Sequence, residues 1–135
     1  MNLIGIVGMP GSGKTELFKS PEFASFEKFD DVLANRERNE QRIRELIQAD
    51  KSVLVSDIEF CDAEWREIFQ RNIGREIEWI YFENAPWKCA INCLFRFYNG
   101  HDRPLQEEIT KINRLTRKYK PLGLTRPVKQ MSPQI

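Results

Sequence analysis

The chain has 135 residues, 41% hydrophobic and 30% charged, which is the composition of one globular domain and excludes a disordered or fibrous chain. The formal charge is +1, and no apolar run approaches the roughly 20 residues that a membrane-spanning helix needs. The three cysteines, Cys61, Cys89 and Cys93, have no zinc-type spacing, which indicates free thiols. We therefore expect a cytoplasmic protein without a membrane partner.

Short apolar runs alternate with amphipathic runs, and this alternation predicts strands and helices in turn. In chain order we expect a strand at 3–7, a helix at 14–20, a strand at 26–30, a helix at 35–48, a strand at 52–57, a helix at 62–74, a strand at 76–83, and helices at 86–98 and 104–119. Such alternation predicts an α/β fold, in which about four parallel strands are layered between helices.

Several residues inside these elements are expected to be structural. Cys89 and Cys93 lie four residues apart on one helix face, which suits small buried side chains better than a soft-metal pair. The tryptophans, Trp65, Trp79 and Trp87, are predicted to fill the core.

The end of the chain is basic. Residues 109–135 hold seven Lys or Arg side chains and no acid. Two interpretations stay open: contact with a polyanion such as nucleic acid, or a solvated helix end and tail. Three prolines and the lack of periodicity predict an extended arm at 121–135, beyond a domain at 1–120.

The clearest functional motif follows the first predicted strand. It reads Gly8-Met9-Pro10-Gly11-Ser12-Gly13-Lys14-Thr15 and matches G-x-x-x-x-G-K-[ST] in full. Glycines allow successive backbone N–H groups to point at phosphate oxygens, and the following helix adds its positive dipole end. Lys14 can reach the β- and γ-phosphates, and the Thr15 hydroxyl can bind Mg²⁺. The motif therefore predicts a nucleotide-binding domain; the alternative is a glycine-rich turn without a ligand.

Asp57 closes a buried strand, where a carboxylate can hold Mg²⁺ from the same crevice. The alternative is a helix cap or a surface acid. The motifs D-x-x-G and N-K-x-D of Ras-like GTPases and the L-S-G-G-Q signature of transporter ATPases are absent, and the chain is too short for a helicase core. The small kinase-like group remains.

Four segments resemble motifs of one such group. The loop Gly8–Thr15 resembles G-x-P-G-S-G-K-[ST], and Phe29-Asp30-Asp31 falls where the group has a paired Asp after the second strand. Val53–Asp57 resembles V-I-I-S-D, and Phe82-Glu83-Asn84-Ala85-Pro86-Trp87 resembles F-D-x-P-W before the lid helix. To residue 123 the chain resembles the kinase domain of phage-type polynucleotide 5′-kinases and their P-loop kinase relatives. The resemblance implies a three-layer α/β/α P-loop fold, ATP and Mg²⁺ as cofactors, Asp30 as catalytic base, and Arg96 and Arg103 as lid arginines.

Chemistry gives these three residues the same roles. Asp30 could accept the proton of a hydroxyl whose oxygen attacks the γ-phosphate, although it could also be a turn acid, and Asp31 could serve either role. Arg96 and Arg103, on either side of a predicted turn, could neutralise charge on the transferred phosphoryl group; the alternative is a surface ion pair.

We therefore expect a kinase that transfers the γ-phosphoryl group of Mg-ATP to a hydroxyl acceptor. The acceptor could be a nucleoside, a nucleic-acid 5′-hydroxyl or another small alcohol. The main alternative is a nucleotide-binding switch or assembly protein without kinase activity. It is favoured by Leu33 and Ala34, which stand where the family has a substrate-binding arginine. A third alternative is a nucleic-acid-binding module that uses the basic end.

Overall fold

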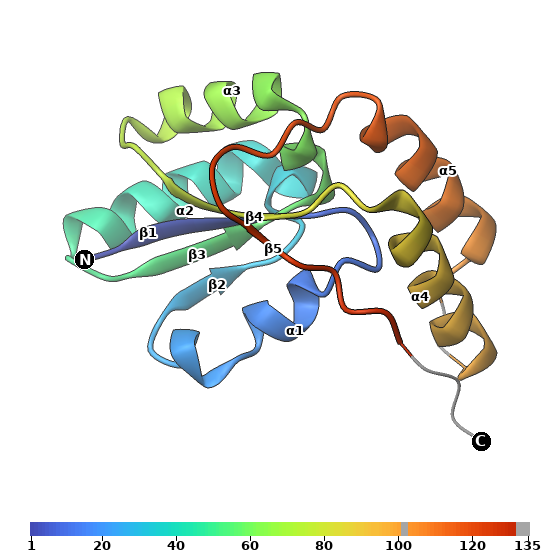
Figure 1. Ribbon diagram of the computed structural model, residues 1–135. Helices are drawn as coiled ribbons and strands as arrows, with labels where there is room; N and C mark the ends of the chain where they lie inside the picture. The colour runs from blue at the N-terminus through green and yellow to red at the C-terminus, as the bar shows by residue number, and fades with distance from the viewer. Residues whose placement is uncertain (101–102, 132–135) are drawn as a thin grey trace.

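The computed structural model describes residues 1–100 and 103–131 (Figure 1). The strands found in this part of the chain are β1 (Leu3–Val7), β2 (Glu27–Phe29), β3 (Val53–Ser56), β4 (Glu78–Phe82) and β5 (Thr125–Arg126). The α-helices are α1 (Lys14–Phe18), α2 (Arg36–Gln48), α3 (Ala63–Ile73), α4 (Pro86–Tyr98) and α5 (Leu105–Thr116), and the short 3₁₀ helices are η1 (Pro21–Phe23), η2 (Val32–Asn35) and η3 (Ile58–Cys61). Each element expected from the sequence is present, with its ends moved by at most three residues.

The strands form one parallel sheet in the order β2-β3-β1-β4-β5, so the predicted α/β class is confirmed. β1 lies at the centre between β3 and β4 and is buried along its whole length, as a continuously apolar strand should be. The sheet has one strand more than predicted. Thr125 and Arg126, in the expected arm, pair with Tyr81 and Phe82 of β4. Two paired residues produce no alternating apolar pattern, so the sequence carried no signal for β5.

Helices cover both faces of the sheet. Figure 1 shows α2 and α3 together on one face and α1 on the other. Right-handed connections require this arrangement, because the chain crosses the sheet in one direction through α1 and in the opposite direction through α2 and α3. α4 and α5 pack against each other beside the ends at which the strands finish. None of the helices in the described residues is long and apolar enough to cross a membrane.

The predicted core is confirmed except for one tryptophan. Trp65 and Trp79 pack against the core, and Cys89 and Cys93 are fully buried, as expected. Trp87, in contrast, is 81% exposed. The reason is geometric: Trp87 lies in the first turn of α4, two residues before Cys89, and so points away from the face that the cysteines bury.

Candidate functional site

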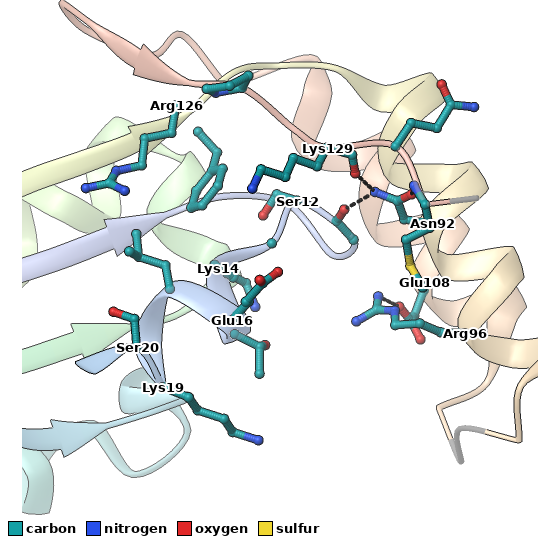
Figure 2. A pocket seen from close by; sticks show the side chains of 18 of the residues that line it. Ser12, Lys14, Glu16, Lys19, Ser20, Asn92, Arg96, Glu108, Arg126 and Lys129 are labelled. Carbon is teal, nitrogen blue, oxygen red and sulfur yellow. Dashed lines mark hydrogen bonds and ion pairs between the residues drawn. The ribbon is translucent and has the colours of Figure 1, made fainter. Parts of the chain in front are cut away.

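The carboxyl ends of the parallel strands meet at one edge of the sheet, which is where α/β folds bind ligands. The loop Gly8–Thr15, here called the glycine-rich loop, follows β1 at this edge. A cavity of about 760 Å³ lies between this loop, α4 and residues 126–131 (Figure 2). Six cations and two acids line it: Lys14, Lys19, Arg96, Arg103, Arg126, Lys129, Glu16 and Glu108. Such an excess of positive charge attracts anionic ligands.

Two glycines with a left-handed backbone shape the glycine-rich loop. Their φ angles are 82° at Gly11 and 102° at Gly13, which residues with a Cβ rarely adopt. A Cβ at Gly11 would also lie 2.3 Å from the carbonyl oxygen of Cys89, so glycine lets the loop lie against α4. Gly13 is the N-cap of α1 and provides no side-chain cap. The first N–H groups of α1 therefore remain open to an anion.

Ser12 and Lys14 add two buried polar groups to the loop. Ser12 is 1% exposed, and its Oγ has no hydrogen-bond partner among the described residues. A buried hydroxyl of this kind costs free energy unless a ligand or a water completes its bonding. Lys14 is 6% exposed, and burial lowers the pKa of its ammonium group. An orphaned hydroxyl, a desolvated cation and open N–H groups together fit phosphate oxygens.

Asp57 follows β3 directly and is buried. Its Oδ1 accepts the N–H of Glu59 at 2.9 Å, and its Oδ2 accepts the N–H of Leu33 at 3.0 Å. Burial raises the pKa of this carboxyl group, and the two hydrogen bonds act in the opposite direction. Asp57 therefore caps η3, which is the alternative role that the sequence left open, and it is not part of the cavity lining.

The residues present can be tested for their fit to Mg²⁺. Thr15 lines the cavity. Within residues 1–100 and 103–131, no group of three His, Cys, Asp or Glu side chains could hold a metal ion. Mg²⁺ that arrives with a phosphate needs no such group, because phosphate oxygens and waters supply most of its ligands. Thr15 fits this mode of binding as a residue of the cavity, whereas Asp57 follows the neighbouring strand at the same edge of the sheet but outside the cavity lining.

Asp30 and Asp31 follow β2 at the edge of the sheet, are exposed, and do not line the cavity. Oδ1 of Asp30 accepts the N–H of Asp31 at 3.0 Å, and Asp31 has a φ of 48° as the N-cap of η2. This is the turn role that the sequence left open. The negative charge of Asp30 nevertheless acts on the loop. Burial lowers the pKa of Lys14, and the charge of Asp30 partly opposes this by raising that pKa.

Arg96 is held by an ion pair inside the cavity wall. Its Nη2 lies 2.8 Å from Oε2 of Glu108, a side chain that is 8% exposed. The Cys93 thiol donates to the same oxygen at 2.9 Å. The ion pair that the sequence left open is thus present, although it lies in the cavity and not on the surface. Arg103 lines the cavity as well, whereas residues 101–102 of the predicted turn lie outside the described residues.

The cysteines are structural, as expected. All three are free and buried. Burial raises the pKa of the Cys61 and Cys89 thiols to about 12, and burial with the bond to Glu108 raises that of Cys93 to about 11. These thiols are protonated at neutral pH and are therefore poor nucleophiles.

Sequence reasoning missed three parts of the cavity: Asn92, Glu108 and residues 126–131. Asn92 carried a usable signal, since it is a polar residue between Cys89 and Cys93 on the buried face of a helix. Glu108 carried none, because it reads as an ordinary first-turn acid of α5.

Comparison with known proteins adds no family. No protein-family model matches the chain, and no curated protein matches it significantly. The chemical character of the site therefore comes from the chain itself. A cationic cavity over a glycine-rich loop with open N–H groups and one buried ammonium suits a phosphorylated ligand.

Proposed function

We propose that the protein is a small kinase of the three-layer P-loop type, which transfers the γ-phosphoryl group of Mg-ATP to a hydroxyl acceptor. The observation that carries this proposal is the glycine-rich loop. It joins the buried central strand to a helix, has left-handed glycines at positions 11 and 13, and buries both the Lys14 ammonium and an unpartnered Ser12 hydroxyl. The buried ammonium and the unpartnered hydroxyl are costly in a turn without a ligand and useful in one that binds phosphates.

Different residues of the site bind different parts of the Mg-nucleotide. The Gly8–Gly13 loop holds the phosphates with the N–H groups of Gly11, Gly13 and the start of α1, since Pro10 has no N–H and the Ser12 N–H donates to the Met9 carbonyl oxygen. The Lys14 ammonium neutralises the β- and γ-phosphates. Thr15 and Asp57 hold Mg²⁺, which supplies further charge neutralisation when bound. Desolvation of Lys14 strengthens its interaction with a phosphate, because the charge acts in a medium of low dielectric constant.

Asp30 serves as the base in this proposal. As the acceptor oxygen forms its bond to the γ-phosphorus, the bond to the ADP oxygen breaks and the hydroxyl proton passes to the Asp30 carboxylate. Its place directly after β2, at the same edge of the sheet as the glycine-rich loop, supports this role. Arg96 and Arg103, both in the cavity wall, neutralise charge on the transferred group. The acceptor is a nucleoside, a nucleic-acid 5′-hydroxyl or another small alcohol.

A second candidate is a nucleotide-binding switch or assembly protein that transfers nothing. Two observations favour it: the Arg96 guanidinium is already paired with Glu108, and Asp30 lies outside the cavity lining. Both observations concern transfer and leave nucleotide binding intact.

Incubation with γ-labelled ATP, Mg²⁺ and a panel of hydroxyl acceptors separates the two candidates. Label on any acceptor, lost in Lys14→Ala and kept in Lys51→Ala, supports the kinase; Lys51 is exposed and outside the cavity. Tight binding of Mg-ATP with no label on any acceptor supports the switch. Absence of binding contradicts both.

A further inference from the structure

Residues 126–131, here called the C-terminal segment, run along the cavity and do not extend away from the protein. Arg126 ends β5, which pairs with β4. Val128 is buried, and its N–H donates to Oε1 of Glu83 at 3.0 Å. The segment is therefore held on the sheet side by a strand pair and a hydrogen bond.

Asn92 holds the other side of the C-terminal segment. This side chain, 4% exposed on α4, donates to the carbonyl oxygens of Gly11 at 2.9 Å and Lys129 at 2.8 Å. Its Oδ1 accepts the N–H of Met131 at 2.7 Å. One buried amide thus ties the glycine-rich loop to the C-terminal segment (Figure 2). Three hydrogen bonds to a buried side chain fix the relative position of the two segments.

The position of Lys129 is a consequence of this arrangement. Its carbonyl oxygen faces Asn92, while its side chain lines the cavity. Of the two acids that line the cavity, Glu108 pairs with Arg96, and Glu16 is exposed and forms no ion pair among the described residues. Among the described residues, no ion pair includes the Lys129 ammonium, whereas Arg126 pairs with Glu22 at 3.8 Å. Lys129 is exposed, and its ammonium is therefore available to an anionic ligand in this cationic cavity.

We propose that Lys129 binds the phosphate chain of the nucleotide, and that Asn92 positions it by tying the C-terminal segment to the glycine-rich loop. The inference rests on the proposed nucleotide site and adds a second wall to it. Lys129 then serves the nucleotide site, in place of the nucleic-acid contact considered for the basic end. Because Asn92 contacts both segments, nucleotide binding at the loop also stabilises the C-terminal segment, and the coupling is reciprocal.

Two charge-matched variants test the role of Lys129. Lys129→Gln removes the ammonium and keeps the carbonyl oxygen that Asn92 binds, while Lys111→Gln removes an exposed ammonium outside the cavity. Calorimetry with Mg-ATP at low salt should show about fivefold to tenfold weaker binding for Lys129→Gln and no change for Lys111→Gln. The difference should shrink to about twofold in 0.5 M salt, because salt screens a partly exposed charge.

A second pair of variants tests Asn92. Asn92→Ala removes the tie, and Asn84→Ala removes a comparable asparagine that donates to the carbonyl oxygens of Thr116 and Tyr119 outside the cavity. Asn92→Ala should speed hydrogen exchange at the Met131 amide and weaken Mg-ATP binding. Asn84→Ala should lower the melting temperature without either effect. In the unmodified chain, Mg-ATP should slow exchange at Met131, which tests the coupling without any substitution.

The outcomes separate the inference from the proposed function. If the unmodified chain binds Mg-ATP and Lys129→Gln binds it equally well at low salt, the inference is overturned and the nucleotide site stands. Unchanged exchange at Met131 on nucleotide binding overturns the role of Asn92. If the unmodified chain takes up no Mg-ATP, the proposed function fails and the inference fails with it.

Discussion

The contact between the glycine-rich loop and α4 can be tested with two glycine-to-alanine substitutions that place alanine in the same left-handed backbone conformation. Gly11 and Gly74 have nearly equal φ angles, 82° and 78°. A Cβ at Gly74 would meet nothing within 4 Å, whereas a Cβ at Gly11 would lie 2.3 Å from the Cys89 carbonyl oxygen. The difference between the two variants therefore isolates the steric contact.

The expected losses follow from these distances. Left-handed strain costs about 1–2 kcal/mol, and alanine returns about 0.4–1 kcal/mol by restricting the unfolded chain, so Gly74→Ala should cost about 1 kcal/mol. Gly11→Ala must in addition move the loop or α4 by about 1 Å, and such overpacking costs about 1–3 kcal/mol more. At about 4 °C per kcal/mol, the melting temperature should fall by about 4 °C for Gly74→Ala and about 8–16 °C for Gly11→Ala.

Thermal unfolding followed by circular dichroism, with and without Mg-ATP, provides the assay. Gly74→Ala should keep the full rise in melting temperature caused by the nucleotide, and Gly11→Ala should lose most of it, because the loop can no longer keep its shape. Equal destabilisation of the two variants would refute the contact between the loop and α4. Full nucleotide affinity in Gly11→Ala would refute the role given to the loop.

Three further substitutions probe individual charges. Burial lowers the pKa of Lys14 from 10.5, so the charged ammonium destabilises the folded protein below the lowered pKa. Lys14→Met should therefore raise the melting temperature of the ligand-free protein at pH 7, and this gain should shrink as the pH approaches 10.5. The same substitution should abolish the rise in melting temperature that Mg-ATP causes. Asp30→Asn should leave Mg-ATP affinity within about twofold in calorimetry while label transfer falls at least about 100-fold, and retained turnover would remove Asp30 as the base. Glu108→Gln should lower the free energy of unfolding, measured with denaturant, by about 1–2 kcal/mol. It should also strengthen Mg-ATP binding, because Arg96 loses its ion-pair partner, and Glu107→Gln is the exposed control. Weaker Mg-ATP binding by Glu108→Gln would contradict this role of the ion pair.

The fold could be predicted from the sequence wherever a short segment carried a clear apolar pattern or a helix-capping residue. The buried strand before Gly8 and the helix limits at Asp62 and Gly74 are examples, since Oδ1 of Asp62 caps α3 and Gly74 ends it in a left-handed conformation. β5 could not be predicted, because two residues pair with β4 only after the sheet has formed.

The candidate site was predictable only in its local part. The motif Gly8–Thr15 lies in one stretch of chain; residues 11–15 line the cavity, whereas Gly8, Met9 and Pro10 are buried and do not. Glu108 and Asn92 act through partners brought close by the packing of α4, α5 and the C-terminal segment, and no spacing in the sequence encodes these contacts. Asp57 and Asp30 were found at strand ends, but their hydrogen bonds depend on η2 and η3, which the sequence did not reveal.

A calorimetric titration of the folded protein with Mg-ATP, repeated with Lys14→Ala, tests nucleotide binding at the glycine-rich loop directly. We expect saturable uptake by the unmodified chain, accompanied by a stabilisation of about 2.7 kcal/mol at 100 times the dissociation constant, and no uptake by the variant. A folded protein that takes up no nucleotide, or a Lys14→Ala variant that binds as tightly as the unmodified chain, would contradict this expectation.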